Sequence, residues 1–415
     1  MTETSHPTSP LISDGESRMT QTQPTTAPRT HQLAPADVRT VDALVDLAVA
    51  GLPATYRPAS AEFTQTVRLV RGRSGVHLQQ EGTNLRYAAI VALGLARMSL
   101  DVQRRVLDGR TADELGALVA ERAVLDPDTG AVALAAWVSA EVRGIVDPAL
   151  LDDLASRLAS GAALPTVDTS WALTAAVASL SVDDSSSTAA VVRDAARERL
   201  LAAQGPQGLF PHALPADSLG RWRSHVGCFA DQVYPIQALA RLATSDDDGV
   251  ALAAAERCAA RIVNLQGPSG QWWWHYDWRD GSVVEGFPVY SVHQHAMAPM
   301  ALFDLAEAGG TDHLDAVVVG MRWLDAHPEV LEDLVSTRHH LIWRKVGRRE
   351  PPKAARSLSA ATTSVMRGLK VPGLDAALPP VRVDHECRPY ELGWLLYAWR
   401  AAGVVEALAP TQEET

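Results

Sequence analysis

Two segments of the chain, 62 residues apart, carry the same helix–turn–loop–helix pattern. One helix ends in the sequence QGPQGLF at 204–210, and another ends in QGPSGQW at 266–272. A polar loop follows each turn, and each loop leads to an apolar helix containing Ala-Leu-x-x-Leu-Ala, at 238–243 and 301–306. A unit of about 60 residues cannot bury its apolar faces alone, so it has to stack against neighbouring units.

The two helices of a unit differ in polarity. The helix before the turn is charged on one side, whereas the helix after the loop is apolar except at its start, which is typical of an outer and an inner helix. Apolar spacing of three and four residues predicts helices at 36–51, 83–98, 111–123, 129–143, 149–159, 168–180, 188–203, 229–243, 249–265, 291–307, 312–325, 328–336, 357–368 and 388–402. The pattern predicts an all-α protein, a single-domain α/α toroid (barrel) of six or seven helical hairpins.

The ends of the chain differ in composition from the rest. Residues 1–33 are rich in Ser, Thr, Pro and Gln, which predicts a disordered N-terminal tail without the apolar segment of a signal peptide. We expect residues 34–405 to form the toroid, as the catalytic domain, and 406–415 to form a disordered C-terminal tail. The 47% hydrophobic and 21% charged residues suit a globular domain of this size.

Charge and cysteine content restrict the partners and the compartment. A net charge of −12 argues against nucleic acid as the partner, because phosphate binding needs a basic surface. No uncharged apolar run reaches about 18 residues, so we expect a soluble protein without a membrane span. Three cysteines cannot form a disulfide framework, and they favour the cytoplasm. The partner is then a small-molecule substrate, and the sequence leaves the oligomeric state open.

The inner helices of such a barrel point their N-termini at one cavity, where helix dipoles favour anions and polar ligands. Polar residues gather at these helix starts. Some of them, such as Asp128, Asp168 and Asp231, are also ordinary N-cap residues. The candidate catalytic residues are Asp168, Asp231, His293 and Glu391. The candidate substrate-binding residues are Arg86, Trp171, Tyr234, Trp272, Trp274, Tyr290, His295 and Tyr390.

The two turns resemble the Gln-x-x-x-Gly-x-aromatic (QW) motif of triterpene and class II diterpene cyclases. The stretch TVDTSWAL at 166–173 is similar to the segment that bears the catalytic acid of those enzymes. This resemblance implies an isoprenoid cyclase in which Asp168 protonates an alkene or epoxide of a linear substrate. Alkene protonation requires a strong, desolvated acid, and aromatic side chains would stabilise the carbocation.

A second hypothesis assigns the same barrel to sugars. The run WWWHYDW at 272–278 interleaves aromatic and polar side chains, as in sites that stack pyranose rings. Asp168, Asp231, Glu285 and Glu391 are candidates for a carboxylate pair that performs acid–base chemistry. The protein would then be an intracellular carbohydrate-active enzyme, a glycoside hydrolase, lyase or epimerase. A third hypothesis is a non-catalytic binding toroid.

No metal or other cofactor is predicted. His293 and His295 are two residues apart, so on a helix they face opposite sides and cannot share an ion. Protein prenyltransferases share the toroid and bind zinc through an Asp, a Cys and a His, but DHEC at 384–387 has the wrong interval. A divalent metal therefore remains an alternative that no sequence motif indicates.

Overall fold

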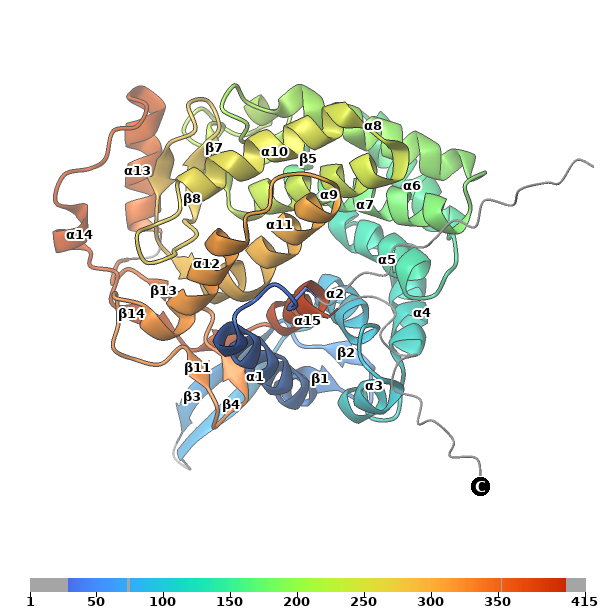
Figure 1. Ribbon diagram of the computed structural model, residues 1–415, viewed down its shortest axis with the longest axis horizontal. Helices are drawn as coiled ribbons and strands as arrows, with labels where there is room; N and C mark the ends of the chain where they lie inside the picture. Colours follow the sequence, from blue (N-terminus) through green and yellow to red (C-terminus); the bar gives the residue numbers. More distant parts are fainter. Residues whose placement is uncertain (1–28, 73–74, 352, 401–415) are drawn as a thin grey trace, which may run out of the picture.

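The computed structural model describes residues 29–72, 75–351 and 353–400. Within these residues the chain is mainly helical, with short strands in the connections (Figure 1). The helices are α1 (Pro35–Gly51), α2 (Leu85–Leu95), α3 (Leu100–Val106), α4 (Ala112–Ala123), α5 (Thr129–Glu141), α6 (Pro148–Ala159), α7 (Thr166–Val182), α8 (Ser187–Ala203), α9 (Ala230–Asp246), α10 (Gly249–Asn264), α11 (Ala298–Glu307), α12 (Leu314–Ala326), α13 (Ala354–Val365), α14 (Leu374–Ala377) and α15 (Pro389–Trp399).

Six of these helices form an inner ring. Going around it, α2 packs on α5, α5 on α7, α7 on α9 and α9 on α11, and α15 returns to α2 (Figure 1). Helices α4, α6, α8, α10 and α12 pack outside their inner neighbours, and α1 packs against α15. The predicted all-α toroid is confirmed, with six hairpins among the described residues.

Burial separates the two layers as the sequence predicts. In the inner helix α5, every residue from 130 to 140 is buried. The outer helix α10 buries one stripe only, with Ala251, Ala255 and Ile262 inward. A helix that is apolar all round fits the wall of a barrel, and an amphipathic helix fits its outer surface.

The repeated turn joins successive hairpins by the same contacts in both copies. The Gln204 side-chain amide donates to the carbonyl of Gly208 (2.9 Å) and to that of Ala254 in the next outer helix (2.8 Å). Gln266 makes the equivalent bonds 62 residues later, to Gly270 (3.0 Å) and Ala316 (2.9 Å). The glutamine therefore links each hairpin to the one that follows it.

The glycines of these turns cannot be replaced without strain. Gly208 and Gly270 have φ values of +87° and +94°, a region that favours glycine. A Cβ on Gly270 would lie 2.2 Å from the carbonyl oxygen of Val319 in α12. The turn thus needs glycine both for its conformation and for the close approach of the next outer helix.

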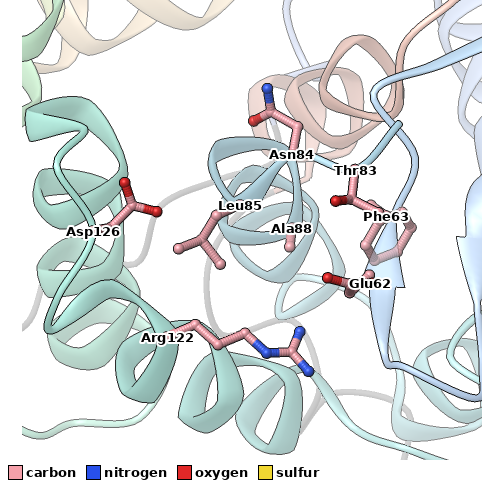
Figure 2. Close-up of a pocket in the computed structure, with 8 residues that line it drawn as sticks. All are labelled: Glu62, Phe63, Thr83, Asn84, Leu85, Ala88, Arg122 and Asp126. Carbon is pink, nitrogen blue, oxygen red and sulfur yellow. The ribbon is translucent and has the colours of Figure 1, made fainter. Parts of the chain in front are cut away.

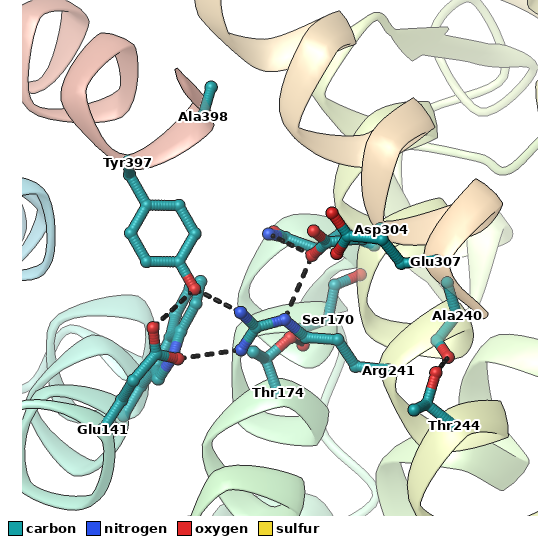
Figure 3. A network of polar contacts seen from close by, with 12 residues as sticks. Glu141, Ser170, Thr174, Ala240, Arg241, Thr244, Asp304, Glu307, Tyr397 and Ala398 are labelled. Atoms are coloured by element: carbon teal, nitrogen blue, oxygen red, sulfur yellow. Dashed lines mark hydrogen bonds and ion pairs between the residues drawn. The ribbon is translucent and has the colours of Figure 1, made fainter. Parts of the chain in front are cut away.

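The end of the barrel at the C-termini of the inner helices is filled by charged side chains (Figure 3). The Arg241 guanidinium donates to Glu141 (2.8 Å) and Asp304 (3.0 Å), and Arg97 also pairs with Glu141 (3.1 Å). The Tyr397 hydroxyl donates to Glu141 at 2.7 Å. The cations beside Glu141 hold its pKa well below the usual range. This end of the barrel is closed by compensated charge.

Several expectations need correction. Residues 328–336 are not a helix; Glu329 instead accepts hydrogen bonds from Gln271 and Trp323, and tertiary contacts override the local apolar spacing. Short strands were not predicted. They are β1 (Tyr56–Arg57), β2 (Glu62–Phe63), β3 (Thr66–Gly72), β4 (Gly75–Glu81), β5 (Leu164–Pro165), β6 (Ala213–Leu214), β7 (Val226–Cys228), β8 (His275–Asp277), β9 (Val283–Glu285), β10 (Val289–Tyr290), β11 (Val335–Ser336), β12 (Leu341–Ile342), β13 (Lys345–Gly347), β14 (Arg382–Asp384) and β15 (Glu386–Cys387).

The strands form small antiparallel sheets in the connections. The longest pair, β3 and β4, makes a hairpin that projects from the barrel (Figure 1), and β15 pairs with β3. Strands β7, β8 and β9 form a second three-stranded sheet, and β10, β13 and β14 form a third. These sheets lie between an outer and an inner helix in the chain, so they surround the starts of the inner helices.

The predicted tails fall mostly on residues outside the described part of the chain. The exception is 29–33, where Arg29 pairs with Glu307 (2.7 Å) and Asp304, and Leu33 is buried. These five residues pack on the barrel, which corrects the boundary of the predicted N-terminal tail. None of the described helices combines the length and the apolar character that a membrane crossing requires.

The ring closes where α2 meets α15, helices about 300 residues apart in the chain. A Cβ on Gly94 would lie 2.3 Å from the carbonyl oxygen of Gly393. A Cβ on Gly393 would lie 3.0 Å from the carbonyl oxygen of Ile90. The two backbones therefore touch directly, and neither position has room for a side chain.

We predict that Gly94→Ala destabilises the protein by about 3 kcal/mol or more, because the methyl group meets backbone that cannot rotate away. The matched control is Gly249→Ala at the first position of α10, where no atom lies within 4 Å of the added Cβ. This control should be neutral or stabilising by up to ~1 kcal/mol. Urea unfolding measures the stability of both variants. Equal unfolding midpoints for the two variants would refute the direct contact between the backbones of α2 and α15.

Candidate functional site

Polar side chains from several inner helices meet at the N-terminal end of the barrel, which we call the mouth. Its best-defined cluster is built on Arg86 of α2. The guanidinium donates to Asp168 at the start of α7 (2.8 and 3.1 Å) and to Asp128, the N-cap of α5 (2.6 Å). The predicted residues Arg86 and Asp168 thus lie together, and Asp128 also caps its helix through the Gly130 amide (3.1 Å).

Asp168 is not a helix cap. Helix α7 begins at Thr166, and its N-cap Pro165 makes no side-chain cap bond. The Asp168 carboxylate is 3% exposed, and burial raises its pKa although the Arg86 charge opposes the shift. A carboxyl group in this environment holds its proton to higher pH than an exposed aspartate.

A second buried carboxylate, Asp231, lies in the first turn of α9. Its Oδ2 accepts a hydrogen bond from the Cys228 amide (2.6 Å) and contacts Nδ1 of His212 (2.9 Å). Asp231 is fully buried, whereas the His212 side chain is 40% exposed, so His212 connects this carboxylate to the mouth. Asp231 raises the pKa of His212, and the nearby Asp168 adds to the effect.

The connection between α8 and α9 places His212 between the two carboxylates. After the turn at 204–210, β6 pairs with β5, which immediately precedes α7. The Thr166 amide donates to the His212 carbonyl (3.0 Å), and the Thr166 hydroxyl donates to that of Pro211 (2.5 Å). These bonds tie the loop to the start of α7, two residues before Asp168.

The start of α15 supplies cations and a buried acid. Arg388 donates to the Tyr87 hydroxyl (2.9 Å), and no carboxylate among the described residues lies within ion-pair distance of it. Glu391 accepts hydrogen bonds from Arg344 (3.2 Å) and from the Arg388 amide (3.3 Å). Burial raises the pKa of Glu391 to about 7. The rings of Tyr87 and Tyr390 are 4.8 Å apart.

The start of the α11 region adds an aromatic wall. A π-helical turn, η3 (His293–Met297), precedes α11. The His293 ring stacks on Trp274 (5.9 Å between centroids) and lies 5.1 Å from Tyr290. Burial lowers the pKa of His293 to about 3, so this imidazole is neutral at physiological pH. The Arg344 guanidinium lies over the Tyr290 ring, 4.9 Å from its centroid. Because Arg344 also donates to Glu391, it links this aromatic wall to α15.

Aromatic residues from three inner helices fill the barrel axis below the mouth. Trp171 packs edge-on against Tyr234 at 5.0 Å, and the Trp394 indole donates to the Tyr234 hydroxyl at 2.8 Å. The Arg86 guanidinium lies over Trp171, 5.3 Å from the ring. Trp171 and Tyr234 are both buried, so they pack into the barrel axis directly below Arg86.

Three predicted residues lie away from the mouth. Trp272 is fully buried between the layers, against Gly320 of the outer helix α12. His295 is fully buried within the inner layer, where its carbonyl accepts from Trp399 (2.7 Å). Glu285 pairs with Arg348 (2.9 Å) in the β9 region outside the ring. Sequence position alone did not show which side of its element each side chain occupies.

Sequence reasoning missed His212 and Arg344. Both come from loops between an outer and an inner helix, where no helical periodicity marks a functional position. His212 had one signal, because it follows the turn at 204–210 by two residues and aligns with Trp274 in the second repeat. Arg344 had none, since it reaches Glu391 only through the pairing of β13 with β14.

A polar cavity of about 310 Å³ lies beside the mouth (Figure 2). Figure 2 shows Asp126 and Arg122 on one side and residues of β2 on the other. Its lining residues are Glu62, Phe63, Thr83, Asn84, Leu85, Ala88, Arg122 and Asp126. Asp126 also accepts a hydrogen bond from the Asp128 amide (2.8 Å), so the cavity adjoins the Arg86–Asp128 pair.

Solved structures of glycoside hydrolases share this fold. An unsaturated glucuronyl hydrolase specific for heparin aligns over 90% of this chain and 98% of its own, with 12% identity and a TM-score of 0.53. The unsaturated glucuronyl hydrolase of Bacillus sp. GL1 covers 88% and 96%, at 11% identity and a TM-score of 0.53. A possible GH105 family member from Salmonella enterica covers 94% and 98%, at 10% identity and a TM-score of 0.52.

No family model and no curated protein matches the chain. The isoprenoid cyclase hypothesis is wrong, because the solved structures reported above that share the fold over most of the chain are glycoside hydrolases. The chain has the fold of α/α-toroid glycoside hydrolases.

Proposed function

We propose that this chain is a glycoside hydrolase that acts on an acidic oligosaccharide at the mouth of the barrel. The observation that carries the proposal is the pair of buried carboxylates, Asp168 and Asp231, at the starts of adjacent inner helices with His212 between them. Glycoside hydrolysis needs one group that protonates the leaving oxygen and one that activates water. Carboxylates supply both roles without a cofactor.

The environments of the two carboxylates suggest their roles. Asp168 has a pKa raised by burial, which suits the proton donor. Asp231 is held through Oδ2 by the Cys228 amide and His212, which suits a group that orients and activates water through the accessible imidazole. Arg86 positions Asp168 by binding both of its oxygens.

The charge of the mouth supports an acidic substrate. Arg86 and Arg344 have carboxylate partners, but Arg388 has none within reach among the described residues. A half-buried guanidinium without an anion is suited to a sugar carboxylate, which it can bind through two parallel hydrogen bonds. The Tyr87–Tyr390 pair and Trp274 provide aromatic faces for sugar rings. The names of the similar structures, which include glucuronyl hydrolases, agree with this substrate class.

We predict that Asp168→Asn and Asp231→Asn each lower kcat/KM for an unsaturated uronyl disaccharide by about 100- to 10,000-fold. An amide at 168 cannot donate the proton, and an amide at 231 lacks the charge that orients and supports the His212 imidazole. Asp183→Asn, at the exposed C-terminal end of α7, is the control and should keep full activity. Neutral disaccharides and linear isoprenoid diphosphates complete the substrate panel. Inactivity of the wild type on every acidic glycan, or full activity of both variants, would refute the proposal.

Arg388→Gln should raise KM for the acidic disaccharide by about 10- to 100-fold and change kcat less. The reason is that a charge-assisted hydrogen bond contributes about 1.5–3 kcal/mol. The methyl ester of the same sugar provides the control, since it lacks the charge and should bind wild type and variant alike. A KM that rises equally for acid and ester would show that Arg388 serves the structure of the mouth and not the substrate carboxylate.

A further inference from the structure

Three potential metal ligands meet at the side of the mouth formed by α9 and the loop before it. They are His212 Nδ1, Cys228 Sγ and an Asp231 carboxylate oxygen, and all three atoms lie within 4.8 Å of one another. The residues come from two separate parts of one connection and from the first turn of α9. A sequence search for zinc motifs does not detect them, because the spacings of 16 and 3 residues match no standard pattern.

The bonding of Asp231 leaves one oxygen available. Oδ2 is occupied by the Cys228 amide (2.6 Å) and His212 (2.9 Å). Oδ1 is buried and has no hydrogen-bond partner. A buried carboxylate oxygen without a partner is costly, and it is uncommon in folded proteins. The Cys228 thiol lies beside this carboxylate, but a thiol is a weak donor.

We propose that His212, Cys228 and Asp231 form a binding site for a zinc ion that inhibits the enzyme. In a tetrahedral zinc site with bonds of about 2.0–2.3 Å, the ligands are roughly 3.3–3.8 Å apart. Small side-chain rotations therefore bring the three atoms into position. A thiolate and an imidazole select zinc over magnesium or calcium, which prefer oxygen ligands.

The binding step is balanced in charge and protons. The Cys228 thiol loses its proton to solvent and binds as a thiolate. His212 gives up the Nδ1 proton that it donates to Asp231 and binds the ion through Nδ1. This proton moves to Nε2 when the imidazole is neutral, and it leaves to solvent when both ring nitrogens are protonated. Asp231 binds through Oδ1. Two negative ligands neutralise Zn²⁺, so the ion does not leave a net charge in this buried place. The exposed side of His212 leaves the fourth position open to water from the mouth.

The inhibitory effect, which rests on the proposed function, follows from the shared residues. A zinc ion that occupies His212 Nδ1 and Asp231 removes the pair that activates water. The Cys228 thiol takes no part in the proposed hydrolysis, and the Cys228 amide that holds Asp231 is retained when serine replaces this residue, so the substitution separates the two roles. Cys258, buried against the Gln232 carbonyl (3.8 Å), is a cysteine of the same chain that lies outside the cluster.

The test begins with binding to the metal-free, full-length protein. Calorimetry with Zn²⁺ should show one site and the release of one to two protons, one from Cys228 and a second wherever His212 is charged before binding. Co²⁺ should give a thiolate-to-cobalt charge-transfer band. Cys228→Ser should weaken zinc binding by about 100-fold or more and abolish the band, whereas Cys258→Ser should leave both unchanged. Mg²⁺ should not compete. The absence of zinc binding, or a band that survives in Cys228→Ser, overturns the site.

Activity then tests inhibition separately. Stoichiometric Zn²⁺ should inhibit hydrolysis by the wild type and by Cys258→Ser, while Cys228→Ser should stay active at the same zinc concentration. Equal inhibition of all three proteins would overturn the inhibitory role. If zinc binds as expected but no glycan is hydrolysed, the proposed function fails and the metal site remains.

Discussion

The direct backbone contact between α2 and α15 determines the geometry of the whole barrel. These helices are the first and last of the inner ring, and they touch at Gly94 and Gly393 because neither residue has a side chain. Closing the ring brings the starts of six inner helices to one end. Residues as distant in the chain as Tyr87 and Arg388 can then share a hydrogen bond (2.9 Å).

The two ends of the barrel use charge in different ways. At the closed end, Arg241 is matched by Glu141 and Asp304, and the network fills the axis (Figure 3). At the mouth, Asp231 retains an oxygen without a partner and Arg388 lacks a counter-ion among the described residues. Incomplete pairing of a carboxylate or a guanidinium costs stability, so these two groups at the mouth are places where a ligand would supply the missing partners.

The repeated Gln-Gly turn shows how a motif can indicate architecture without indicating chemistry. Gln204 and Gln266 bind carbonyls of the next outer helix, and Gly270 allows that helix to approach. Any toroid built from stacked hairpins can use these contacts. The resemblance to terpenoid cyclases therefore predicted the barrel correctly and the reaction wrongly, since the solved structures that share this fold include glycoside hydrolases.

Local pattern in the sequence was sufficient for the inner and outer helices of the barrel, for the alternation of the two layers and for the placement of Asp168, Asp231 and Glu391 at inner-helix starts. These features depend on the 3.6-residue period and on the direction of each helix. The same pattern missed the short helices α3 and α14 and wrongly predicted a helix at 328–336. Only the tertiary structure showed that Arg86 binds Asp168, that His212 reaches Asp231, and that Trp272 and His295 face away from the mouth. Such contacts depend on loop paths and on the rotation of each helix about its axis, which are decided by packing between segments far apart in the chain.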